Sequence, residues 1–183
     1  MAAYAASRPS VAAPGTTFVY SSGTSNIVSR ALSDHLGLRG PDLGRWLSSN
    51  LFEPLGMGSP TPKFDQAGHW IASSYYFSTA RDFARFGLLY LRDGVWDRQR
   101  LLPAGWVDHA RTLTPASVGV ELRPYGAHWW LNNDERGTFA VSGYAGQRIW
   151  LVLTTDLVIV RLDESDESHR DALLESLEAG AFD

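Results

Sequence analysis

The chain has 183 residues and 44% of them are apolar, which is enough for a packed core and excludes a disordered chain. Its net charge is −4 and its basic residues form no block or stripe, so we expect no nucleic-acid binding. It has no cysteine, which excludes disulfides, thiolate catalysis and thiolate zinc sites.

Helices are predicted for most of the first part of the chain. Pro14-Gly15 is typical of a turn and precedes a short extended entry. The next segment predicts an amphipathic helix from near Thr24 to Gly37, with its apolar positions at Ile27, Val28, Ala31, Leu32 and Leu36. A second short helix is predicted over 41–50, because proline is tolerated in a first turn.

The middle of the chain is predicted to hold a long loop and two helices. The loop covers 59–78 and carries aromatic side chains that we expect to anchor it: Phe64, Trp70, Tyr75, Tyr76 and Phe77. Thr79 and Asp82 are typical of a helix start, where threonine caps the first N–H groups and the acid faces the positive end. That helix is expected to end at Gly94, and Pro103 is expected to begin another.

The last third is predicted to form a sheet. Runs rich in apolar residues indicate strands over 127–131, 138–142, 148–154 and 157–162. The third run is apolar on both faces, which predicts a sheet covered on both sides, and the last two strands are expected to form a hairpin. Acidic residues ahead of leucines predict a C-terminal helix packed on the sheet. The expected fold class is therefore α+β, a helical region followed by an antiparallel sheet and a closing helix.

Two motifs carry the chemistry of this sequence. Tyr20-Ser21-Ser22 opens the first long helix, and Gly143-Tyr144-Ala145-Gly146-Gln147 separates two apolar strands. Serine acylation needs a nucleophile, a group that takes its proton, and donors for the oxyanion. No Ser-x-x-Lys is present to supply the nucleophile, because the single lysine is Lys63 and Pro60 stands three residues before it.

The order of these features resembles the serine β-lactamase and penicillin-binding protein superfamily. It is most similar to the class C-like branch, which includes esterases, D-aminopeptidases and 6-aminohexanoate-dimer hydrolases. The resemblance covers nearly the whole chain, in this order: Pro14-Gly15-Thr16, Tyr20-Ser21-Ser22, 51–57 (LFEPLGM), 78–87 (STARDFARFG), Leu101-Leu102-Pro103 and 143–147 (GYAGQ). It implies a β-lactamase/transpeptidase-like fold and hydrolysis through an acyl-enzyme.

The resemblance implies roles for six residues. Tyr20 would be the base and the acid for the leaving group, beside a lysine that makes its phenol more acidic. The N–H of Gln147 would be one oxyanion donor, and substrate would be bound by Ser22, Tyr144, Ala145 and Gly146. From the residues alone, other roles stay open: an aromatic anchor for Tyr20, a helix N-cap for Ser22, a strand bulge at the glycines and a core aromatic at Tyr144.

Departures from the family pattern refine these expectations. Ser22 stands where class C β-lactamases carry Asn, and Tyr144 stands where β-lactamases carry Lys, which favours a small-molecule ester or amide substrate over an antibiotic. Ser-x-x-Lys lies upstream in the family. We therefore expect residues 1–183 to be the C-terminal part of one domain, inactive alone, with the missing N-terminal segment packed against it. The alternative is a non-catalytic binding or scaffold domain.

Metal, cofactor and membrane sites are not expected in this chain. The five histidines are isolated and no pair has the spacing of zinc ligands, so we expect no metal and no other cofactor. No apolar run is long enough to cross a bilayer, so we expect no membrane segment.

Overall fold

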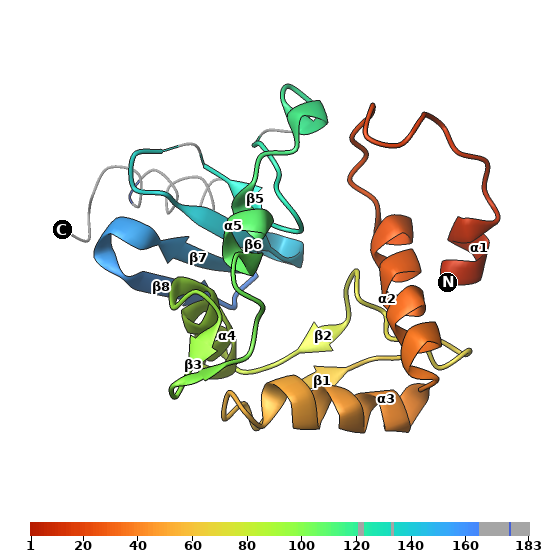
Figure 1. The fold of residues 1–183 in the computed structure, drawn as a ribbon, viewed down its shortest axis with the longest axis horizontal. Coiled ribbons are helices and arrows are strands. Elements are labelled where there is room, and N and C mark those ends of the chain that lie inside the picture. The colour runs from red at the N-terminus through yellow and green to blue at the C-terminus, as the bar shows by residue number, and fades with distance from the viewer. Residues whose placement is uncertain (121–122, 133, 165–175, 177–183) are drawn as a thin grey trace.

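The computed structural model describes residues 1–120, 123–132, 134–164 and 176, and Figure 1 shows its ribbon. The α-helices are α1 Ala2–Ala6, α2 Ser22–Leu36, α3 Gly40–Leu47, α4 Ala80–Leu91 and α5 Trp106–Arg111. Short helical turns of other types are η1 Ser48–Phe52, η2 Pro115–Ser117, η3 Tyr144–Gly146 and η4 Leu153–Thr155. The strands are β1 Thr61–Pro62, β2 Tyr76–Phe77, β3 Val95–Trp96, β4 Gln99–Arg100, β5 Trp130–Leu131, β6 Phe139–Ser142, β7 Arg148–Val152 and β8 Leu157–Arg161. Within the described ranges, no helix is both long and apolar enough to span a membrane.

α2 ends where the sequence predicts, but it turns a different face inward. Ser21 caps its start by accepting from the Gly23 N–H at 3.1 Å, and Gly37 ends it in the left-handed region at φ 67°. The buried residues of α2 are polar, namely Asn26, Ser29 and Ser33. Ile27 and Val28 are exposed, so their assignment to an inward apolar face is wrong.

Hydrogen bonds to a neighbouring loop explain why the polar face of α2 is buried. Asn26 Nδ2 donates to Ser73 Oγ at 3.1 Å, and Ser29 Oγ donates to the Trp70 carbonyl at 2.6 Å. A buried hydroxyl that keeps a hydrogen bond costs little on folding. The loop that precedes β2 therefore holds α2 through polar contacts, and no apolar stripe is required there.

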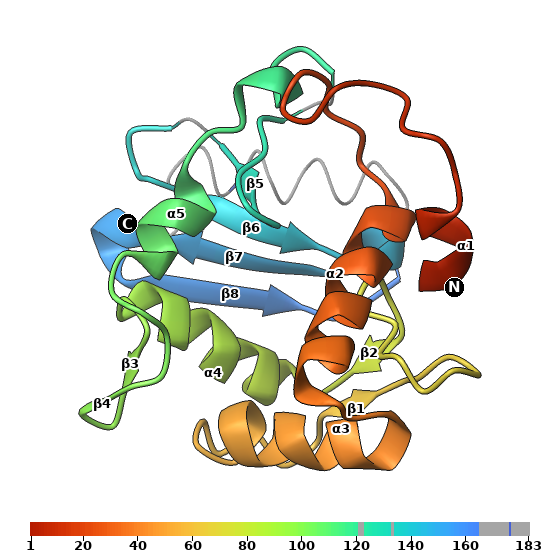
Figure 2. The same ribbon diagram turned by 45° about the vertical axis from the view of Figure 1, so that its right-hand side comes forward.

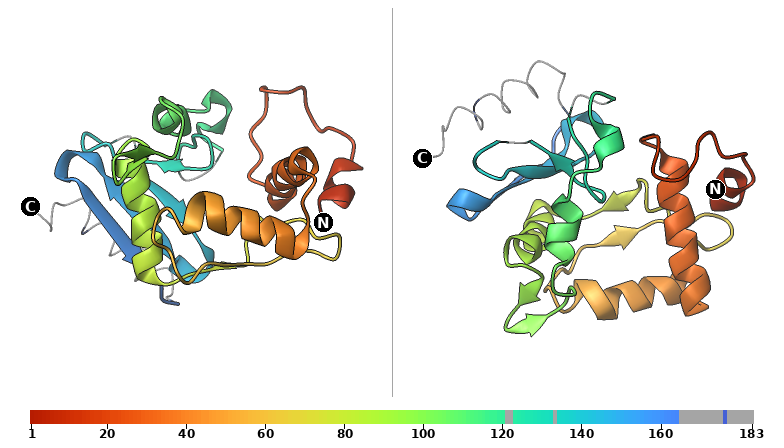
Figure 3. Two further views of the ribbon diagram at one scale, coloured as in Figure 1. Left: turned by 60° about the horizontal axis from the view of Figure 1, so that its bottom comes forward. Right: turned by 45° about the horizontal axis from the view of Figure 1, so that its top comes forward.

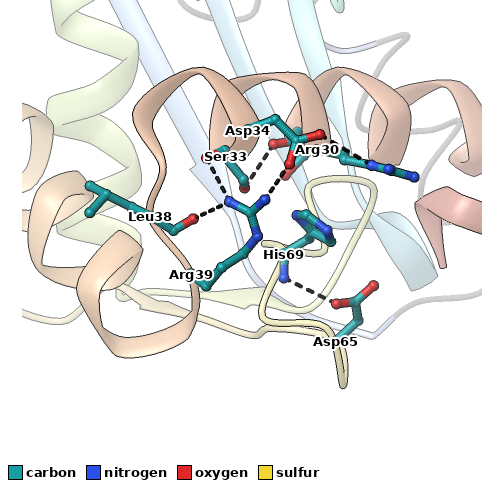
Figure 4. Close-up of polar contacts among 8 residues, drawn as sticks. Arg30, Ser33, Asp34, Leu38, Arg39, Asp65 and His69 are labelled. Carbon is teal, nitrogen blue, oxygen red and sulfur yellow. Dashed lines mark hydrogen bonds and ion pairs between the residues drawn. The ribbon is translucent and has the colours of Figure 1, made fainter.

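Arg39 joins the end of α2 to the start of α3 (Figure 4). Its Nη1 donates to the carbonyls of Ser33 and Leu38 at 2.6 and 2.7 Å, and its Nη2 pairs with Asp34. The Ser33 carbonyl also accepts from the Leu38 N–H at 3.2 Å, so Arg39 adds a charged donor at the end of α2. The start of α3 is also bonded to the loop before β2, because the N–H of Gly40 donates to the carbonyl of Gly68 at 2.7 Å.

The last strands form one antiparallel sheet in the order β5-β6-β7-β8, which confirms the predicted sheet and its final hairpin. α4 packs against β7 and β8 on one face (Figures 2 and 3). Its Gly87 permits this approach, since an added Cβ would lie 2.6 Å from Val158 Cγ1. Leu151 and Trp150 alternate across β7 and are 0% and 1% exposed, so both faces are covered as predicted.

The apolar core lies in two clusters on the α4 side of the sheet. One cluster joins the sheet to α4 and α5 through Tyr90, Val107, Ala110, Trp129, Leu131, Phe139, Ile149 and Leu151. The other lies between α3, η1 and α4 and is formed by Leu43, Leu47, Phe52, Leu55, Met57 and Leu89. The fold is α+β, with a helical region before an antiparallel sheet. The predicted C-terminal helix lies outside the described residues.

Two details of the prediction were wrong in ways that the backbone explains. β5 begins at Trp130, not at residue 127, because the Gly126 N–H donates to the Trp129 carbonyl at 2.8 Å and closes a tight turn with His128 at φ 64°. In the loop 59–78, Phe64, Trp70 and Tyr76 pack against the second cluster as anchors. Tyr75 and Phe77 are exposed and do not anchor it.

Candidate functional site

The ring of Tyr20 packs against two other aromatic rings, and its side chain stays partly exposed to solvent. It lies just before the Ser21 cap of α2, and its ring packs 5.1 Å from Trp130 and 5.7 Å from Tyr125 between centroids. The side chain nevertheless remains 55% exposed. Burial, with an added contribution from Tyr20, raises the pKa of Tyr125 above its ordinary value.

Ser22 lies one residue inside α2 and is exposed to solvent. The N-cap role that the sequence left open for it belongs to Ser21, whose side chain accepts the Gly23 N–H. The Ser22 hydroxyl is therefore not needed to cap the helix. An exposed hydroxyl in the first helical turn can contact a bound molecule.

The turn at 143–147 has the backbone geometry of a tight reversal between β6 and β7. Ala145 lies in the left-handed region at φ 55° and ψ 34°, and Gly146 follows at φ 85°. The Gly143 N–H donates to the Gln147 carbonyl at 2.8 Å, and the Gln147 N–H donates to the Tyr144 carbonyl at 3.3 Å. Tyr144 is 87% exposed, so it is not a core aromatic.

Two arginines bind the carbonyl groups of this turn. Arg148 Nη1 donates to the carbonyls of Gly143 and Gln147 at 3.2 and 2.9 Å. Arg161 Nη1 donates to the carbonyl of Gly146 at 3.0 Å, and its side chain is only 18% exposed. Both guanidinium groups therefore fix the backbone of the turn from the strands β7 and β8 that bear them.

Tyr20 and the turn lie toward the same end of the sheet. Tyr20 contacts Trp130, which pairs with Ala140 in β6, and β6 leads directly into Gly143. In Figure 2, β6 and β8 both run toward α2. Among the described residues, no hydrogen bond or ring pair joins Tyr20 or Ser22 to residues 144–147. The two motifs are thus positioned by one sheet without being bonded to each other.

Sequence reasoning missed the residues that support this site. Tyr125 and Arg161 carry no motif, and their roles depend on which strands are neighbours. The structure buries Trp129 in the first core cluster and leaves Trp130 against Tyr20. Within the described ranges, no group of three or more possible metal ligands comes together.

Sequence comparison relates this chain to known hydrolases. The sequence model of the family described as Beta-lactamase matches residues 1–179. A 6-aminohexanoate-dimer hydrolase from Paenarthrobacter ureafaciens is 31% identical over 154 residues, which is 79% of this chain and 38% of that protein. The chain thus spans well under half of the length of this relative.

Solved structures share the fold at low sequence identity. A Bacillus anthracis protein assigned as a 6-aminohexanoate-dimer hydrolase matches 93% of this chain and 45% of its own length, with a TM-score of 0.77 and 24% identity. A β-lactamase from Mycobacterium bovis matches 91% of this chain and 66% of its own length, with a TM-score of 0.68 and 24% identity. Simvastatin synthase from Aspergillus terreus matches 91% of this chain and 54% of its own length, with a TM-score of 0.65 and 18% identity. The shared fold is that of the β-lactamase and transpeptidase proteins.

Proposed function

The chain belongs to the Beta-lactamase family, and on this basis we propose that it contributes two of the three elements of a serine hydrolase site. The site would cleave a small-molecule ester or amide through an acyl-enzyme. Tyr20 would take the proton of the nucleophile and return it to the leaving group, and the Gln147 N–H would stabilise the oxyanion. Substrate would contact Ser22, Tyr144, Ala145 and Gly146.

The exposure of Tyr20 is the observation that carries this proposal. An aromatic residue that only anchors the start of α2 does not need an exposed side chain. Tyr20 instead packs one part of its ring on Trp130 and Tyr125 and remains 55% exposed. A base must be fixed in position and must reach the proton that it abstracts. The ring contacts of Tyr20 support the first requirement, and its exposure supports the second.

The nucleophile would come from a segment that carries Ser-x-x-Lys, which is absent from these 183 residues. Apolar side chains that stay exposed just before α2 and along it support a covering segment over this part of the chain. Val19 lies beside Tyr20, and Ile27 and Val28 lie on α2 one to two turns from Ser22. Exposed apolar groups that gather near a site are typical of surfaces that contact another segment.

Tyr144 supports an ester or amide substrate over a β-lactam. A lysine at this place would offer an ammonium group to the carboxylate of an antibiotic, whereas the exposed side chain of Tyr144 offers a hydroxyl. The curated relative is named for hydrolysis of the 6-aminohexanoate dimer. We therefore propose short linear amides and simple esters as the first substrates to examine.

Covalent labelling separates this proposal from a binding or scaffold role. The 183-residue chain should neither hydrolyse p-nitrophenyl acetate above background nor react with a serine-directed phosphonate, because it lacks the nucleophile. A polypeptide that joins these residues to a Ser-x-x-Lys segment should bind one phosphonate, at that serine, and turn over the ester. Stoichiometric labelling of the 183 residues alone would contradict the proposal. Absence of labelling and turnover in the longer polypeptide would favour the non-catalytic alternative.

A further inference from the structure

Tyr75 has a backbone conformation that bulky residues seldom adopt. Its φ is 56°, in the left-handed region, where a side chain with a Cβ is strained. Most other residues with this conformation lie where the chain reverses between neighbouring elements, as Asp97 and Arg98 do between β3 and β4. Tyr75 instead directly precedes β2, at the end of the long loop from β1. Backbone strain of this kind is concentrated at active sites and ligand-binding positions.

Contacts on both sides of Tyr75 hold this conformation. Two residues earlier, Ser73 Oγ accepts from Asn26 Nδ2 in α2 at 3.1 Å. One residue later, the ring of Tyr76 packs edge-on against Phe83 in α4, with 5.6 Å between the ring centroids. The segment is therefore tied to two helices within four residues, and strain persists only where the surrounding structure fixes the backbone in this way.

The side chain of Tyr75 takes no part in these contacts. It is 59% exposed, and no hydrogen bond or ring pair joins it to any other residue that the structure describes. A contact of the side chain within the fold thus does not account for the strained backbone. The exposed side chain offers an apolar ring face and a hydroxyl to a bound molecule.

The loop places Tyr75 beside the proposed substrate site. Asn26, which binds the loop, comes four residues after Ser22 and lies on the same face of α2. In Figures 1 and 2 the segment that leads into β2 lies beside α2, on the side toward the end of the sheet. The turn that carries Tyr144 follows β6 at that end. The site is thus bordered by α2, by the sheet and by the loop that ends at Tyr75.

We infer that Tyr75 is a specificity-determining residue of the proposed hydrolase, whose ring contacts an aliphatic chain of several carbons on the acyl side or the leaving-group side of the scissile bond. This inference rests on the proposed function and narrows its substrate class. Tyr75 and Tyr144 both present exposed rings, and burial of methylene groups against aromatic rings is favourable. A chain of one or two carbons is too short to gain from both rings.

The chain length of ester substrates tests this inference in a polypeptide that carries these residues and a Ser-x-x-Lys segment. The acyl chain is varied with p-nitrophenyl acetate and p-nitrophenyl hexanoate, and the leaving group with methyl acetate and hexyl acetate. Tyr75→Ala should lower the ratio of kcat/KM for the longer to the shorter chain about 10-fold on one side. Tyr75→Phe should keep the ratio, because the ring remains. The control Tyr4→Ala, at an exposed tyrosine of α1, should change neither ratio. Two unchanged ratios in Tyr75→Ala would overturn the inference.

Binding of an amide separates this inference from the proposed function. If the joined polypeptide hydrolyses the esters and Tyr75→Ala keeps both ratios, this inference alone fails. If the joined polypeptide hydrolyses none of them, the proposed function fails, and the Kd of N-butylhexanamide, measured by calorimetry, decides the role of Tyr75. A Kd raised about 10-fold in Tyr75→Ala would support the contact. An equal Kd, or no binding to wild type, would overturn it.

Unfolding of the 183-residue chain tests whether the side chain serves the fold instead. Tyr75→Gly should unfold at the same denaturant concentration as wild type or at a higher one, because glycine adopts a positive φ without strain and no side-chain contact is lost. A clearly lower midpoint would show that the side chain supports the fold, and would overturn the inference.

Discussion

Tyr20 and Tyr125 are neighbouring phenols that the packing distinguishes. Tyr125 is half-buried between Phe18, Tyr20 and Trp130, and this burial raises its pKa. Tyr20 stays partly exposed on the outside of this aromatic group. The ring of Tyr125 therefore supports the ring of Tyr20, and the side chain of Tyr20 stays accessible to solvent. The same exposed environment holds for Tyr144 and Ser22, which we assign to substrate contact.

Substitution of Tyr144 and Ser22 should change the preferred substrate. In a polypeptide with the Ser-x-x-Lys segment, Tyr144→Lys together with Ser22→Asn should raise kcat/KM for a cephalosporin relative to p-nitrophenyl acetate. The reason is that a fixed ammonium attracts the drug carboxylate through a charge-assisted hydrogen bond. Steady-state kinetics on both substrates measure the ratio, with Tyr4→Lys as a control at an exposed tyrosine of α1. An unchanged ratio would argue against the pocket roles of Tyr144 and Ser22.

Among the elements, α2 shows what could and could not be predicted. Its end was predictable because Gly37 acts through local backbone geometry, whereas its start, capped by Ser21, lies two residues before the predicted start near Thr24. Its inward face was not, because Asn26 and Ser29 are bonded to a loop more than forty residues away in the chain. Helical periodicity assumes an apolar partner for the inward face. Because the partner of α2 is a loop that offers a carbonyl and a hydroxyl, the inward face of the helix shows no apolar periodicity.

The β3–β4 hairpin stores strain that one substitution should relieve. Asp97 and Arg98 form its tip with φ values of 49° and 66°, a conformation that favours Asp-Gly or Asn-Gly. Arg98→Gly should raise the free energy of unfolding by about 0.5–1 kcal/mol, the left-handed strain less the added chain entropy. Denaturant unfolding measures this change. The control Gln99→Gly, in β4, should destabilise, and a loss of stability in Arg98→Gly would show that the tip is unstrained.

For the whole molecule, the buried carboxylate of Asp82 ties the loop after Met57 to α4. Its oxygens accept from the Ser59 N–H at 2.9 Å, from Ser59 Oγ at 2.6 Å and from Arg85 Nη1 at 2.5 Å. Burial alone would raise the pKa of Asp82, but these bonds outweigh it and hold the pKa below its usual value. A lowered folded pKa stabilises the protein above the unfolded pKa of about 3.9, and this stability is lost as pH falls through the folded pKa.

Asp82→Asn should therefore destabilise the chain in a pH-dependent way. At pH 7 the free energy of unfolding should fall by about 2 kcal/mol, the cost of a lost charged hydrogen bond in a buried place. The difference from wild type should shrink below about pH 4. Denaturant unfolding between pH 2.5 and pH 7 provides the comparison, with the exposed Asp42→Asn as control. A difference that is constant over this range would show that the charge of Asp82 is unimportant.

The candidate site, like α2, was predictable only where its residues are contiguous in the sequence. The motifs at Tyr20 and at 143–147 were visible in the sequence because each is contiguous. Arg161 was not, because its contact with Gly146 depends on the pairing of β7 with β8. Tyr125 was not, because its ring meets Tyr20 only when the turn at 126–129 returns the chain to β5. The roles of all six residues named from the motifs remain predictions.

The claim that Tyr20 is the base of an acyl-enzyme hydrolase is tested most directly by removing its hydroxyl. In a polypeptide that carries these residues and the Ser-x-x-Lys segment, kcat and KM for p-nitrophenyl acetate are measured for wild type and Tyr20→Phe. The phenylalanine keeps the ring contacts with Trp130 and Tyr125 and loses only the proton carrier. We predict that kcat falls about 10²–10⁴-fold with little change in KM. A kcat near that of wild type would contradict the account and leave Tyr20 as a structural aromatic.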